Sequence, residues 1–152
     1  SLMPPGGRVS LAEVVPRQAQ RLSALLPPEA LGEALAARVR EAEEAIYHRP
    51  DDPLVNWDVP DLQAALQAAG FALSTPLQCE TQTEERRITA AHLARWLSQT
   101  AGEGGRLTYA QHLLRAISPE ELCCVTACLQ RQLLDQTVSW HSAVVYVLAT
   151  AA

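Results

Sequence analysis

Three of the four cysteines form the group of residues that comes nearest to a metal site. Cys124 and Cys128 are four residues apart in an apolar helical pattern, so both would lie on one face of a helix, with Cys123 beside them. Zinc needs four ligands in tetrahedral reach, and the chain has neither a Cys-x-x-Cys nor a His-x-x-x-His spacing. We therefore predict no metal site, and reduced cysteines that pack as small apolar side chains.

The remaining reactive side chains do not combine into a catalytic pattern. The histidines are scattered through different predicted elements, and adjacent acids such as Glu84 and Glu85 do not face each other on a helix. All twelve basic residues are Arg, and the absence of Lys removes Schiff-base chemistry and the phosphate-binding lysine of a Walker A loop. We predict no catalytic and no cofactor-binding residue.

Glu13 and the residues that follow it are the one candidate for a pocket or interface. Glu13 lies near the carboxyl end of an apolar run, and open α/β sheets place their ligands at that edge. Arg17, Gln18 and Arg21 follow closely. Two interpretations stay open: Glu13 pairs with Arg17 at the junction of a strand and a helix, or the four residues line a pocket or interface in a larger protein.

Composition favours one compact domain. The chain has 152 residues, of which 48% are hydrophobic and 19% charged, and its net charge is -5. The negative charge disfavours direct binding of nucleic acid. No apolar run is long enough to span a bilayer, and we expect a cytoplasmic protein with no membrane contact. Residues 1–7 look like a tag or linker remnant before a single domain over 8–152, and we expect this domain to be a fragment of a larger protein.

The elements predict a helix-rich α/β fold with a small three-stranded mixed sheet. The strands are expected at residues 8–15, 71–80 and 138–149. Pro76 should place the second strand at a sheet edge or in a bulge, because proline cannot donate to a ladder. The third strand is apolar on both alternating sets from Ala143 onward, which predicts that both of its faces are covered.

About six helices are expected around this sheet. One should follow Arg17, and Pro28 should open the next. Another should begin at 59 behind Asp58 and end at Gly70. A helical segment over about 88–136 should hold three more, one over 89–99 and two that begin with the capping boxes of Thr108 and Ser118.

The order of these segments resembles the carboxyl half of a class I S-adenosylmethionine-dependent methyltransferase, a Rossmann-type fold. The resemblance rests on a Gly-rich turn before the first strand, the Ala69-Gly70-Phe71 junction before the second, and an apolar terminal strand. It implies that the terminal strand runs antiparallel between the other two. The segments around 13–22 and 56–58, with Arg95-Trp96 and Val138-Ser139-Trp140, look more narrowly like the methyltransferase-like extension behind a bacterial replication-associated recombination AAA-type ATPase.

The resemblance implies a noncatalytic interaction or scaffold module of a cytoplasmic protein of DNA replication or recombination maintenance. The alternative is the substrate-side half of a methyltransferase. The glycine loop and ribose-binding acid of that family match nothing here, so no cofactor is expected in this chain, although the complete parent could bind S-adenosylmethionine. Activity of the parent as a methyltransferase or ATPase fusion is left open. The expected partners are the rest of the parent chain and a second copy, paired through the strand at 8–15.

Overall fold

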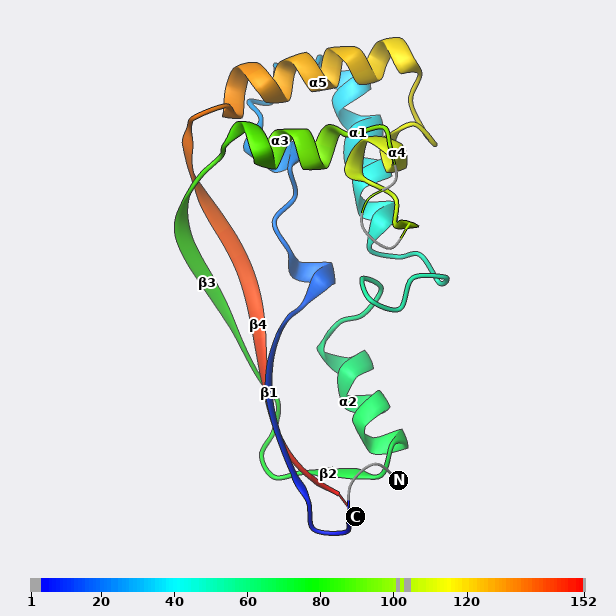
Figure 1. Cartoon of the computed structure of the whole chain (residues 1–152), viewed down its shortest axis with the longest axis vertical. Coiled ribbons are helices and arrows are strands. Elements are labelled where there is room, and N and C mark those ends of the chain that lie inside the picture. The colour runs from blue at the N-terminus through cyan, green and yellow to red at the C-terminus, as the bar shows by residue number, and fades with distance from the viewer. Residues whose placement is uncertain (1–3, 101, 103–104, 152) are drawn as a thin grey trace. The chain divides into compact units, whose positions relative to one another are not determined.

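The protein forms two compact units in a computed structural model that describes residues 4–100, 102 and 105–151 (Figure 1). The sheet unit comprises residues 4–19, 47–83 and 141–151, and the helical unit comprises 20–46 and 84–140. The single domain over 8–152 and the remnant at 1–7 stay predictions, and residues 1–3 of the latter lie outside the described residues.

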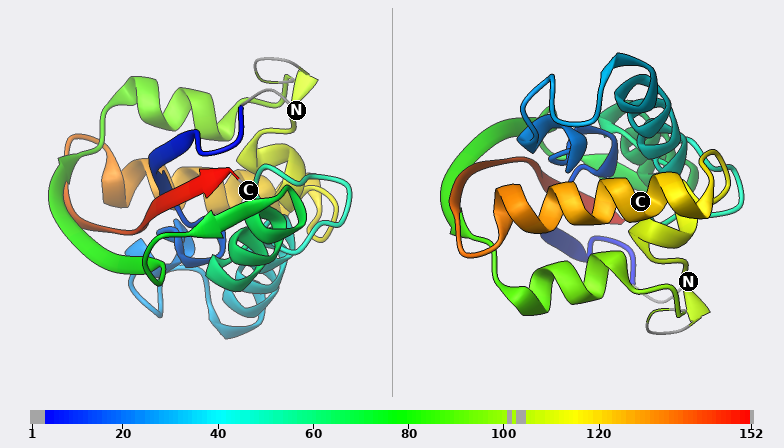
Figure 2. Two further views of the ribbon diagram at one scale, coloured as in Figure 1. Left: turned by 90° about the horizontal axis from the view of Figure 1, so that it is seen from below. Right: turned by 90° about the horizontal axis from the view of Figure 1, so that it is seen from above.

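The sheet is antiparallel and has four strands: β1 (Arg8–Val14), β2 (Phe71–Leu73), β3 (Gln78–Arg87) and β4 (Thr137–Ala151). β4 is central, and the order is β1-β4-β2, with β3 also paired to β4. Figure 2 shows the blue β1 and the green β2 on either side of the red end of β4. The prediction of three strands in a mixed sheet was wrong, because each outer strand runs antiparallel to β4 and no parallel pair forms.

The fourth strand arises where one strand was predicted over 71–80. The chain leaves the ladder between Leu73 and Gln78 and returns to it as β3, which continues to Arg87. Pro76 lies in this interruption, and its missing N–H cannot join a ladder. The prediction placed Pro76 within a strand, at a sheet edge or in a bulge, but Pro76 lies between two separate strands. The polar residues after it form the second strand.

β4 is covered on one face only, which corrects the prediction of a doubly covered strand. Ala143, Val145 and their alternate neighbours Val147 and Ala149 are buried, whereas Leu148 is 50% exposed. In the core of the sheet unit Val15, Ala143 and Val145 pack with side chains around the start of α2 (Val59–Ala68), namely Trp57, Val59 and Leu62, and with Leu77. The opposite face is apolar in sequence, but no second layer covers it among the described residues.

α2 begins and ends where the sequence predicts. The Asp58 carboxylate accepts from the Val59 N–H at 2.7 Å, and Asp61 accepts from the Asp58 N–H at 3.0 Å, which completes a capping box. Gly70 follows the helix with a φ of 84°, the left-handed conformation that glycine adopts without strain. Local signals alone therefore fix this helix.

The helical unit contains α1 (Glu33–Ile46), α3 (Ala90–Leu97), α4 (Tyr109–Leu113) and α5 (Pro119–Leu133). Thr89, Thr108 and Ser118 each cap a helix with a reciprocal box, which confirms the two predicted boxes. The helical segment predicted over about 88–136 is closed by backbone hydrogen bonds, from Ile88 N–H to the Gln136 carbonyl and from Asp135 N–H to the Ile88 carbonyl, both 2.8 Å. The described residues form five α-helices and two 3-10 helices, close to the expected number.

The apolar core of this unit is made by residues from all of its helices. Its most deeply buried residues are at most 2% exposed. They include Val39, Ile88, Leu113, Leu122, Val125, Leu129 and Leu133.

The helix predicted after Arg17 does not form. In its place are two single 3-10 turns, η1 (Pro16–Gln18) in the sheet unit and η2 (Ser23–Leu25) in the helical unit. The Leu22 and Ser23 N–H groups donate to the Glu43 carboxylate at 2.5 and 3.1 Å rather than to a preceding turn. α1 also starts later than Pro28, because Gly32 adopts a φ of 72° and interrupts the right-handed path.

Candidate functional site

The four residues predicted to share a pocket or interface are divided between the two units, and their common pocket or interface stays a prediction. Arg17 and Gln18 lie side by side in η1, at the amino end of α2 within the sheet unit. Arg21 belongs to the helical unit. Glu13 is exposed, and its carboxylate makes no hydrogen bond or ion pair with any residue that the structure describes, although its backbone pairs with Val145 in the ladder. The interpretation in which Glu13 pairs with Arg17 is therefore wrong.

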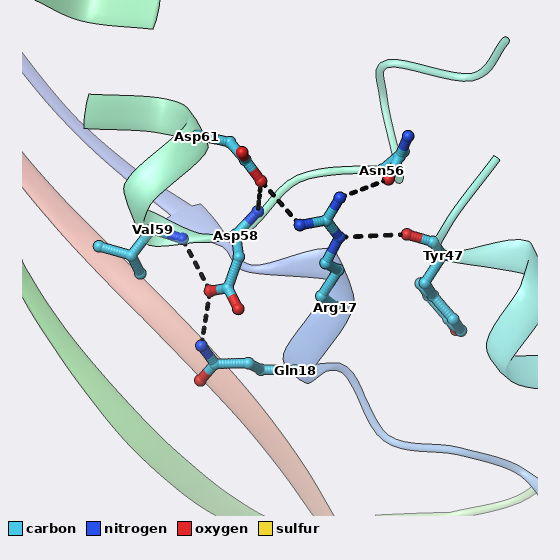
Figure 3. Close-up of polar contacts among 7 residues, drawn as sticks. All are labelled: Arg17, Gln18, Tyr47, Asn56, Asp58, Val59 and Asp61. Atoms are coloured by element: carbon cyan, nitrogen blue, oxygen red, sulfur yellow. Dashed lines mark hydrogen bonds and ion pairs between the residues drawn. The ribbon is translucent and has the colours of Figure 1, made fainter. Parts of the chain in front are cut away.

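Arg17 is held by three partners that are distant in sequence (Figure 3). Its guanidinium donates to Asp61 Oδ2 at 2.8 Å, to Asn56 Oδ1 at 2.7 Å and to the Tyr47 carbonyl at 3.4 Å. The side chain is 29% exposed, so part of this network is shielded from water. Arg17 thus joins η1 to both ends of the loop that precedes α2.

Gln18 completes the polar cluster from the other side of the same turn. Its Nε2 donates to Asp58 Oδ1 at 2.7 Å, the same oxygen that caps the Val59 N–H (Figure 3). Asp58 and Asp61 therefore each accept one hydrogen bond from the backbone at the start of α2 and one from a side chain of η1. The Arg17 side chain and the two carboxylates are engaged with one another, and the start of α2 is capped, so the cluster acts as a structural clamp.

Arg21 takes part in a second, separate cluster. It forms a two-pronged ion pair with Glu44, at 2.6 and 3.0 Å. Glu43, the next residue, is 2% exposed, and burial raises the pKa of its carboxyl above the ordinary value, while the hydrogen bonds from Ser23 and Leu22 act in the opposite direction. Because Glu43 is a buried acceptor for backbone amides, its role is to shape the 20–25 segment.

The cysteines and metal-binding residue types form no cluster in the described part of the chain. No group of three or more His, Cys, Asp or Glu side chains converges there. Cys128 is buried, and its Sγ lies 3.8 Å from the Ala30 carbonyl, whereas Cys79, Cys123 and Cys124 are exposed. Of the clustered cysteines predicted to pack as small apolar side chains, Cys128 does so, and the prediction was wrong for Cys123 and Cys124.

Sequence reasoning missed the feature that most resembles an interaction surface. On the uncovered side of the sheet, Val14 is 49% exposed, Tyr146 38% and Leu148 50%. The register places Val14 and Ala12 of β1 beside Val144 and Tyr146 of β4, so these side chains share one face. We call the surface of Val14, Tyr146 and Leu148 the exposed face. The sequence shows apolar residues on both alternating sets of β4, but periodicity cannot tell a covered face from an uncovered one.

β1 also has one edge along which no strand of the described residues lies. Val15 N–H donates to the Ala143 carbonyl and Ala151 N–H to the Gly7 carbonyl, both at 2.8 Å, so the odd-numbered residues of β1 point their backbone groups at β4. The even-numbered residues point theirs away from β4; these are Arg8, Ser10, Ala12 and Val14. All four are exposed, and outside the β1–β4 ladder none of their backbone groups bonds to a described residue.

Comparison with known proteins adds no family to these observations. No protein-family model and no curated protein matches the chain. The methyltransferase-like resemblance stays a prediction. No helix among the described residues is long and apolar enough to cross a membrane.

Proposed function

We propose that the chain is a noncatalytic interaction module of a larger cytoplasmic protein of DNA replication or recombination maintenance, and that it works through the exposed face. The observation that carries the proposal is the half-exposed trio of Val14, Tyr146 and Leu148 on a sheet whose other side is packed. Apolar side chains gathered on one uncovered face are typical of protein contact surfaces. The polar cluster at Arg17, by contrast, offers no reacting group.

The strand order supports a methyltransferase-like parent. A central strand that runs antiparallel between two others is what the resemblance implies for strands five, seven and six of that fold, and the order here is β1-β4-β2. In this proposal the sheet is the carboxyl part of a Rossmann-type sheet, placed behind an AAA-type ATPase. The helical segment over 88–136 is then an insertion before the last strand.

The same strand order supports the alternative, the substrate-side half of an S-adenosylmethionine-dependent methyltransferase. In that alternative the cluster of Arg17 and Gln18 borders a substrate pocket that the rest of the protein completes. Titration calorimetry separates the two. We expect no heat of S-adenosylmethionine binding to this chain, because no glycine turn and ribose carboxylate of the family pattern occur in it. Binding in the low micromolar range would favour the methyltransferase.

A photo-crosslinking experiment tests the interaction module itself. A photoreactive phenylalanine derivative replaces Leu148 on the exposed face, and the matched control carries it at Leu54, a leucine that is 66% exposed but lies in the 47–58 loop. In the cells that make the protein, we expect 148, and not 54, to be crosslinked to the AAA-type ATPase part of the parent chain. Equal crosslinking at both sites, or none to an ATPase from 148, would refute the proposal.

A further inference from the structure

We infer that a second copy of this chain pairs along the free edge of β1, antiparallel and about a two-fold axis at Leu11. The inference goes beyond the proposed function and does not need the methyltransferase-like parent, in which a further strand would pair with this edge; it names the partner for the edge rather than for the exposed face. The edge offers the backbone groups of Arg8, Ser10, Ala12 and Val14, and N–H and C=O groups are obligatory hydrogen-bonding groups.

The bounds of β1 select the register. Leu11 is the middle residue of Arg8–Val14, so an axis at Leu11 pairs the strand with its copy over its whole length. Arg8 then faces Val14 of the second copy, and Ser10 faces Ala12. These are the outward-pointing residues, and the two-fold axis repeats each pair, so four pairs form. Each pair exchanges two backbone hydrogen bonds, which makes about eight across the junction. If the axis lay one residue earlier, at Ser10, Val14 would face Gly6 of the second copy. The Gly6 N–H already donates to the Ala151 carbonyl.

Side chains permit this register. Cross-strand partners lie on the same face of a sheet, so Arg8 meets Ala12 and Val14 of the second copy, and Glu13 meets Val9. The two Arg8 residues lie at opposite ends of the junction, as do the two Glu13 residues, and no like charges meet. The edge also lacks the proline and lysine residues that protect natural edge strands.

The proposed junction extends the exposed face. A two-fold axis perpendicular to the sheet keeps the Val14 sides of both copies on the same surface, so the apolar stripe continues from one copy into the next. A seven-residue edge is small beside a standard interface of about 1,600 Å², and the dimer is therefore expected to dissociate on dilution. Sedimentation velocity over a wide concentration range suits such a dimer.

The first test removes one outward N–H without touching the β1–β4 ladder. Ala12→Pro deletes the donor of an exposed residue that points away from β4, and Ala12→Val keeps that donor as the matched control. We expect wild type and Ala12→Val to dimerise with similar dissociation constants, and Ala12→Pro to raise the constant at least about tenfold. A wild-type chain that stays monomeric at several hundred micromolar, or an unaffected Ala12→Pro dimer, would overturn the inference.

The second test reads the register and does not depend on how well the proline variant folds. In a chain whose exposed cysteines 79, 123 and 124 are changed to serine, Leu11→Cys should form an intermolecular disulfide on mild oxidation. The two Leu11 residues would face each other in a close, non-hydrogen-bonded pair of about 4.5 Å between Cα atoms. Ser10→Cys, one position away, should not crosslink. Crosslinking at 10 and not at 11 would refute the register.

These outcomes are separate from those of the proposed function. A monomeric chain whose position 148 still crosslinks to an ATPase would refute the second copy and leave the interaction module standing. A dimer whose position 148 gives no ATPase crosslink would refute the interaction module and leave the second copy standing.

Discussion

Replacing Glu43 by Gln is expected to destabilise the helical unit and to change how its stability depends on pH. The carboxylate of Glu43 accepts from the Leu22 N–H at 2.5 Å and from the Ser23 N–H at 3.1 Å. A glutamine amide keeps one acceptor oxygen, but its NH2 group faces the second N–H and cannot accept from it. Leaving one buried amide without an acceptor costs about 1–3 kcal/mol.

The pH dependence has a definite sign. Burial raises the pKa of Glu43 in the folded protein, so between the unfolded and the folded pKa the folded state binds more protons than the unfolded state. The contribution of Glu43 to stability is therefore fully present below the unfolded-state pKa and is lost as the pH rises through the folded pKa. The Gln variant lacks this titration, so the advantage of wild type over the variant should shrink as the pH rises from the ordinary carboxyl pKa through the raised pKa of folded Glu43.

Urea unfolding followed by tryptophan fluorescence measures both effects, since Trp96 and Trp140 pack against the core of the helical unit. With a slope of roughly 2 kcal/mol per molar urea, a loss of about 2 kcal/mol lowers the midpoint by about 1 M. Glu41→Gln, at an exposed position of the same helix, is the control and should change the midpoint little. A wild-type advantage that grows with pH, or a Glu43→Gln midpoint equal to that of the control, would refute the reasoning.

Three further outcomes are expected. Arg17→Ala should lower the free energy of unfolding by about 1 kcal/mol, because it removes the hydrogen bonds of a partly exposed guanidinium to Asp61 and Asn56. In the same denaturation assay the control Arg8→Ala should change it by less than about 0.5 kcal/mol. In the folded protein a thiol reagent such as a disulfide dye should label the three exposed cysteines quickly and Cys128 only as slowly as the protein opens; four equally fast thiols would contradict the burial of Cys128. Labelled DNA duplex should not be retained at physiological salt, because the net charge of -5 provides no counterion release, and tight, salt-sensitive retention would count against this expectation.

Local signals in the sequence placed most helices correctly. Asp58 and Gly70 bracket α2, and Thr108 and Ser118 begin α4 and α5, because a capping side chain satisfies amides only two or three residues away. The missing N–H of Pro76 is also a local signal; it indicated a disturbance of the ladder, but not that the chain would form two separate strands there. Such features depend on nearest neighbours along the chain, so they can be read without the fold.

Tertiary structure decided everything that depends on residues far apart. Arg17 meets Asp61, 44 residues later, rather than the nearby Glu13, and the segment around Leu22 follows the buried Glu43 rather than its own helical periodicity. Arg17 and Arg21 belong to different units despite their short separation in sequence. The apolar alternation of β4 established that both faces carry apolar residues, but whether a face is covered depends on how many layers pack on the sheet. Only the fold showed that α2 covers one face and that Val14, Tyr146 and Leu148 lie exposed on the other.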